Sequence, residues 1–122
     1  MAGIEETVPE RRARRAAAQE VFDALAVDYL GRPGVSSGPM FGSQGLRSDG
    51  KFFAFVGRAG DLVLKLPPEQ AAALVAGGQA TAVRAGRNAT REWVSVPRSP
   101  GEGTARWSIL LEDAYRYAGQ SI

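Results

Sequence analysis

The run from Phe52 to Val56 is apolar at every position, and this feature constrains the fold most strongly. Because successive side chains of a strand alternate between faces, Ala54 and Val56 are expected beside Phe52 on one face. Phe53 and Phe55 are expected on the opposite face. A strand that is apolar on both faces needs cover on both sides. Helices supply one cover, and a partner subunit is our hypothesis for the other, which makes Phe53 and Phe55 candidate interaction residues.

Turn and helix signals on both sides of this run predict the remaining elements. Gly31 and Pro33 end a long helical segment that lacks Gly and Pro, and Asp49-Gly50 suits a hairpin turn. The expected elements are a helix at 10–30, a connector at 31–38, strands at 40–47, 51–58 and 61–66, a helix at 67–76, strands at 81–85 and 92–96, and a helix at 104–118. This order predicts an α+β fold, an antiparallel β-meander sheet with helices packed on one face. Residues 1–9 are expected to form a flexible tail before a single domain at 10–122.

Lys65 lies among the apolar residues that follow Asp61 in the strand predicted at 61–66. Leu62, Leu64 and Leu66 are expected to face one way, with Val63 and Lys65 facing the other. Burial of an ammonium group without a partner is costly. Lys65 is therefore expected to face water, where it protects a strand edge, or to pair with an acid. That acid is Asp61, Glu92 or a residue across a dimer interface.

Two tryptophans are large enough to anchor either a core or an interface. Trp107 lies in the apolar stripe of the last predicted helix, so we expect it in the core. Trp93 alternates with Val94 on the predicted strand at 92–96, and we include it among the candidate interaction residues.

Histidine and cysteine are both absent from the chain. Their absence excludes disulfides, thiolate nucleophiles, imidazole bases and most transition-metal sites. Adjacent carboxylates such as Glu112 and Asp113 are interpreted as solvated charge on a helix, because paired acid catalysis needs a cleft and two distinct environments. The sequence therefore predicts a non-enzymatic protein with no catalytic, metal or cofactor residues.

Four arginines near the N-terminus form one dense basic run, although the net charge is only +2. On a helix, Arg11, Arg12, Arg14 and Arg15 spread over about half the circumference and could grip phosphates. Glu10 precedes them and can pair with Arg14 at the i,i+4 spacing. A nucleic-acid-binding regulator that uses this run is the alternative hypothesis.

No segment has the roughly 18 apolar residues that a membrane helix requires. The first ten residues are acidic and contain no apolar stretch typical of a signal peptide. We therefore expect a cytoplasmic protein that does not bind membranes.

Several segments together carry a family resemblance: Met40-Phe41-Gly42, Asp49 to Ala54, Asp61 to Pro67, Arg91 to Pro97 and the helix with Trp107. They resemble the N-terminal domain of the TfoX (Sxy) competence regulators over residues 15–118, with the YjbR-like family as a neighbouring similarity. The resemblance implies a standalone α+β domain like that of secretion chaperones, often dimeric and without established catalytic residues.

These observations lead to one principal hypothesis. The protein is expected to be an interaction or regulatory module that forms a homodimer and binds a protein partner of unknown identity. The residues proposed to carry these contacts are Phe53, Phe55, Lys65 and Trp93.

Overall fold

The first helix begins where its own side chains cap it. The computed structural model describes residues 7–40, 42–98 and 104–120. The Thr7 hydroxyl accepts a hydrogen bond from the Glu10 backbone N–H, and the Glu10 carboxylate accepts one from the Thr7 backbone N–H. This capping box starts α1 (Val8–Leu30) at Val8 rather than at the predicted Glu10. Of the predicted tail, residues 1–6 lie outside the described residues.

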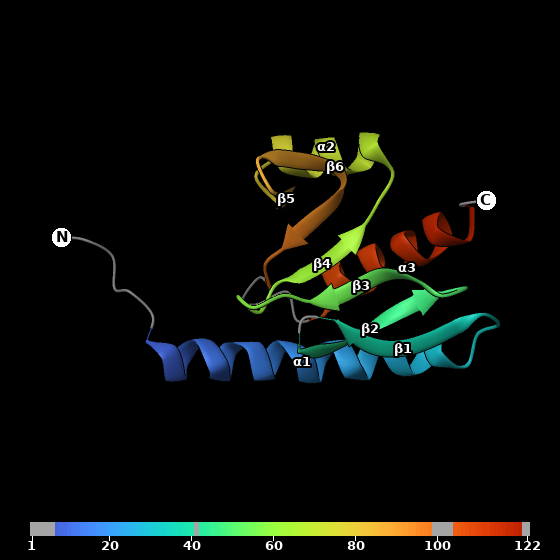
Figure 1. Cartoon of the computed structure of the whole chain (residues 1–122), viewed down its shortest axis with the longest axis horizontal. Helices are drawn as coiled ribbons and strands as arrows, with labels where there is room; N and C mark the ends of the chain where they lie inside the picture. Colours follow the sequence, from blue (N-terminus) through green and yellow to red (C-terminus); the bar gives the residue numbers. More distant parts are fainter. Residues whose placement is uncertain (1–6, 41, 99–103, 121–122) are drawn as a thin grey trace.

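The sheet is antiparallel throughout and lies against three helices, which confirms the α+β class (Figure 1). Its strands and the remaining helices are β1 (Val35–Met40), β2 (Ser43–Ser48), β3 (Lys51–Val56), β4 (Leu62–Lys65), α2 (Pro68–Ala76), β5 (Thr81–Ala85), β6 (Asn88–Val96) and α3 (Ala105–Gln120). The strand order is β1-β2-β3-β4-β6-β5. The first four strands form a meander with one strand more than predicted, and β6 then pairs with β4 and leaves β5 at the edge.

The segment at 31–48 differs from the prediction. The connector expected at 31–38 contains the start of β1, and the strand expected at 40–47 is divided between β1 and β2. Ser, Gly and Pro in β1 are poor strand formers, but β1 is an edge strand, where Pro39 is tolerated. The turn predicted at Asp49-Gly50 is confirmed, since both residues have positive φ, 50° and 83°.

A β-bulge changes which side chains of β3 share a face. Leu46 on β2 lies opposite Ala54, whereas Arg47 lies opposite Phe52, so Phe53 is the extra residue between them. Because a bulge interrupts the alternation of side chains, Phe53 joins Ala54 on the face that packs against the helices. The Phe53 ring lies 6.0 Å from that of Tyr115 on α3. The prediction that Phe53 and Phe55 share a face is therefore wrong.

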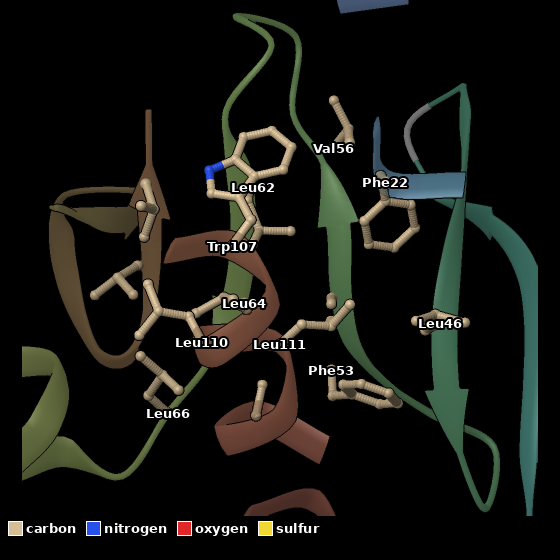
Figure 2. Close-up of a cluster of buried hydrophobic side chains, with 14 of the residues drawn as sticks. Phe22, Leu46, Phe53, Val56, Leu62, Leu64, Leu66, Trp107, Leu110 and Leu111 are labelled. Atoms are coloured by element: carbon tan, nitrogen blue, oxygen red, sulfur yellow. The ribbon is translucent and has the colours of Figure 1, made fainter. Parts of the chain in front are cut away.

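All three helices contribute to one hydrophobic core on what we term the inner face of the sheet. Phe22 of α1 and Trp107 of α3 are 2% exposed and pack with side chains of the strands (Figure 2). α2 contributes Ala71 to the same core. Gln70 of α2 also donates a hydrogen bond of 2.8 Å to Asp113 of α3, which places both helices on the same side. The predictions of helices on one face and of Trp107 in the core are confirmed.

Candidate functional site

The opposite face of the sheet carries aromatic side chains that no described helix covers. We term this the outer face. Phe55 and Val63 lie opposite each other on β3 and β4, and both are buried, at 8% and 7% exposed, yet they are outside the core cluster. The half-buried Trp93 ring of β6 lies 6.0 Å from the Phe55 ring at an interplanar angle of 52°. Neighbouring side chains of the sheet thus provide part of the cover for Phe55.

Two opposite charges flank Val63 on the outer face. Asp61 accepts a hydrogen bond of 2.9 Å from the hydroxyl of Ser95, which is the cross-strand partner of Val63. Lys65 lies two residues beyond Val63, opposite Trp93. The part of the chain that the structure describes offers no carboxylate oxygen within 4.0 Å of the Lys65 ammonium. Asp61 therefore lies on the same face as Lys65, but the two side chains do not pair within the chain.

The β1–β2 part of the outer face is lined by glycine backbone. Gly38 and Gly45 are direct cross-strand partners and both are buried. A Cβ atom at Gly45 would lie 3.0 Å from the Phe55 Cβ and 3.1 Å from the Phe52 ring. The guanidinium of Arg47 stacks 5.6 Å from the centre of the Phe52 ring. The aromatic surface therefore continues from Trp93 to Phe52, and next to it Gly38 and Gly45 contribute backbone but no side chains.

Among the predicted interaction residues, the structure brings Phe55, Trp93 and Lys65 together on the outer face. Phe53 is 0% exposed and belongs to the core. The prediction that Phe52 shares a face with Ala54 is wrong, because the bulge between these residues depends on pairing with β2. The alternation of β4 was sufficient to place Val63, but we did not select it as a site residue.

A polar cluster missed by the sequence analysis joins α1 to α3. Glu112 is half-buried and accepts hydrogen bonds from the Tyr29 hydroxyl at 3.0 Å and from two nitrogens of Arg32 at 3.1 and 3.3 Å. Arg116 adds a third donor residue at 3.1 Å. The Arg32 hydrogen bonds, opposed by partial burial, hold the pKa of Glu112 below its ordinary value. Glu112 is therefore a structural ion-pair centre rather than the solvated charge expected from sequence.

The same cluster perturbs the phenol of Tyr29. Burial, with a smaller effect from the hydrogen bond to Glu112, raises the pKa of Tyr29 to about 12. The Arg32 guanidinium lies 4.2 Å from the centre of the Tyr29 ring and 4.7 Å from that of Tyr115. These contacts fix the end of α1 against α3, so the cluster accounts for stability without requiring a ligand.

The predicted basic run lies in the N-terminal turns of α1. Arg11, Arg12 and Arg14 are exposed, whereas Arg15 is half-buried and donates a hydrogen bond of 2.6 Å to the Ser43 hydroxyl. The backbone of Arg14 lies against the β3–β4 turn at Gly60. The four arginines are therefore divided between open positions and positions in contact with the sheet.

Within residues 7–40, 42–98 and 104–120, no group of three or more acidic side chains is placed to hold a metal ion. None of the helices described is both long enough and apolar enough to span a bilayer.

Comparison with known families supports the resemblance seen in the sequence. The model of the TfoX N-terminal domain matches residues 28–118. The chain belongs to the TfoX N-terminal domain family. The match includes the whole sheet, α2 and nearly all of α3, but only the last turn of α1. Neither the curated proteins nor the solved structures contain a significant match to this chain.

Proposed function

We propose that this member of the TfoX N-terminal domain family is a non-enzymatic interaction module whose outer face binds a second copy of the same chain. The observation that carries the proposal is the aromatic and valine surface of Phe55, Val63 and Trp93, which has no helix over it among the described residues. An aromatic sheet face without a helix packed on it is typical of an interface, because rings supply large contact area at low entropic cost.

The arrangement of charges favours a second copy as the occupant. Asp61, which immediately precedes β4, and Lys65, the last residue of β4, are each two residues from Val63. A twofold axis in the interface plane, perpendicular to β4 and passing over Val63, reverses the strand direction in the partner copy. Each Lys65 then faces the Asp61 of the other chain, while Phe55 and Val63 meet their own copies. An isologous interface of this kind requires such a self-complementary patch.

The non-enzymatic part of the proposal rests on composition. The chain has no histidine and no cysteine, so imidazole bases and thiolate nucleophiles are excluded. The polar cluster around Glu112 uses its donors in ion pairing between helices. A regulatory role and a cytoplasmic location belong to the same proposal, and fractionation of the native cells tests the location.

Light scattering coupled to size exclusion, over a range of protein concentrations, tests the self-association. We expect the wild-type chain to reach twice the mass of one chain at high micromolar concentration. Trp93→Ala should raise the dimer Kd by roughly tenfold or more, as expected for an aromatic anchor at the centre of an interface. A wild-type chain that stays monomeric at every concentration contradicts the proposal.

The matched control removes an apolar side chain from a different surface. Ile109 on α3 is 64% exposed and belongs to the helical side of the molecule. Ile109→Ala should leave the dimer Kd unchanged. Equal weakening by Ile109→Ala and Trp93→Ala would place the interface elsewhere.

A further inference from the structure

The N-terminal turns of α1 and the β3–β4 turn together form a hollow whose charged lining is entirely basic among the described residues. The hollow has a volume of about 350 Å³ and is lined by Val8, Arg11, Arg12, Arg15, Arg58 and Ala59. Arg58 is distant in sequence from the other three arginines, so its presence follows from the fold. Arginines that line one hollow favour the binding of an anion, because like charges that lie close together repel each other.

A close backbone contact holds the two segments together. Gly60, at a φ of 81°, lies so near to α1 that an added Cβ would meet the Arg14 carbonyl oxygen at 3.2 Å. Through this contact the β3–β4 turn packs against α1, so that Arg58 lines the hollow. The hydrogen bond from Arg15 to the Ser43 hydroxyl, at 2.6 Å, orients a second guanidinium. The hollow is therefore built by tertiary structure and not by a helix surface alone.

Two acids of α1 on either side of these arginines, Glu10 and Asp23, have other hydrogen-bond partners. Glu10 accepts from the Thr7 backbone N–H in the capping box. Asp23 accepts a hydrogen bond of 2.8 Å from the Gln19 amide. Neither carboxylate belongs to the lining of the hollow. The charged side chains in the described lining are therefore all basic, although the whole chain carries only +2.

We propose that this arginine hollow, defined by Arg11, Arg12, Arg15 and Arg58, binds the phosphate backbone of double-stranded nucleic acid. Arginine binds phosphate through forked N–H donors, which suits a row of phosphodiesters. No described residue of the lining is aromatic, so the hollow lacks the stacking platforms that single strands require. Figure 1 shows the N-terminal turns of α1 extending past the end of the sheet.

Two further observations separate this site from the outer face. α1 packs on the inner side of the sheet, so the hollow and the proposed dimer surface use different residues. The family match begins at residue 28, which leaves Arg11, Arg12 and Arg15 outside it. Arg58 lies inside the match, so the hollow combines one arginine of the matched domain with three that precede it. Its test is independent of the test of dimerisation.

The experiment measures binding of the full chain to a fluorescent duplex of arbitrary sequence by anisotropy across a salt series. With three to four phosphate contacts, log K should fall against log salt with a slope of roughly −2.7 to −3.6. The affinity should then fall roughly 40- to 150-fold between about 50 and 200 mM salt. A second duplex of different sequence should give the same slope and the same fall in affinity.

Paired substitutions identify the contact residues. Arg12→Gln with Arg58→Gln should reduce the magnitude of the slope by roughly 1.8, at about 0.9 for each lost contact. The control is Arg84→Gln with Arg87→Gln, since both arginines are exposed in the β5–β6 hairpin and carry the same charge. This control should keep the wild-type slope. Thermal melts that match the wild type confirm that both double variants are folded.

Three outcomes overturn the proposal. The first is the absence of duplex binding at about 50 mM salt. The second is an equal loss of slope in the hairpin control, which would make the binding a property of net charge. The third is binding of inorganic tripolyphosphate by a chain that does not bind the duplex, which would assign the hollow to a small free polyanion.

Discussion

The two faces of the sheet both carry phenylalanine, but they bury it in different ways. Phe53 on the inner face is 0% exposed and lies among helix side chains, with Tyr115 of α3 at 6.0 Å between rings. Phe55 on the outer face is 8% exposed and lies beside Trp93 of the sheet itself. The inner face is therefore covered by helices, whereas on the outer face the described contact of Phe55 is with another side chain of the sheet. Burial alone does not distinguish a core residue from a candidate interface residue.

The sharpest test of this difference compares alanine substitutions at the two phenylalanines. Phe53→Ala should lower the free energy of unfolding by about 3–5 kcal/mol, because it leaves a cavity in the core. Phe55→Ala should cost about 1–2 kcal/mol in the monomer, because it removes less enclosed apolar contact. Urea denaturation at low protein concentration, where self-association is weak, gives both values.

In a measurement of the dimer Kd, Phe55→Ala should have the larger effect of the two variants. Phe55→Ala should weaken self-association, whereas a folded population of Phe53→Ala should retain it. If Phe55→Ala destabilises the monomer as much as Phe53→Ala does, the outer face is a second hydrophobic core of the monomer. The proposed difference between the two faces is then wrong.

The comparison also shows what the sequence could and could not predict. Leu62, Leu64 and Leu66 alternate without interruption, so their burial on the inner face followed from the pattern alone. The positions of Phe52 and Phe53 did not, because the bulge depends on the register between β2 and β3. Local alternation carries no information about a register that is set by another strand.

Two other features were beyond the sequence for similar reasons. β1 contains Ser, Gly and Pro, and it forms a strand because β2 pairs with its backbone rather than because of its side chains. Arg58 reaches the arginine hollow only through the packing of the β3–β4 turn on α1. Lys65 could be selected from sequence because it interrupts the apolar pattern of its strand. Trp93 could be selected because it extends the apolar pattern of its own strand.

A smaller effect is expected from adding a side chain at a glycine position of the outer face. Gly45→Ala places a Cβ at 3.0 Å from both the Ala54 carbonyl oxygen and the Phe55 Cβ. We expect a loss of about 1–3 kcal/mol in the free energy of unfolding, as for other overpacked sites. Gly31→Ala is the control, since nothing lies within 4 Å of its added Cβ. Equal melting temperatures for the two variants would show that β2 and β3 are not packed as described.

The smallest expected effect concerns the helix layer that completes the inner face. The pKa of Glu112 is lowered from its ordinary value of 4.5, chiefly by the hydrogen bonds from Arg32. A carboxylate with a lowered pKa stabilises the fold above its unfolded pKa, and this contribution is lost as the pH falls through the folded pKa. The wild-type protein should therefore lose stability below about pH 4.5 more steeply than Glu112→Gln.

Chemical denaturation between neutral pH and about pH 3 measures this dependence. The control, Glu69→Gln, removes a carboxylate that is exposed on α2 and should follow the wild-type curve. Parallel curves for the wild type and Glu112→Gln would mean that the α1–α3 cluster does not contribute to holding the helices on the inner face.

The central claim, that the outer face binds a second copy through Val63 with Asp61 facing Lys65, is tested most directly by mixing two charge variants. In Lys65→Asp and in Asp61→Lys, like charges face each other across the twofold axis, and each variant alone should be monomeric by sedimentation equilibrium. In an equimolar mixture both charge pairs are restored between unlike chains, so a heterodimer should form. A mixture that stays monomeric while the wild-type chain dimerises would contradict this arrangement.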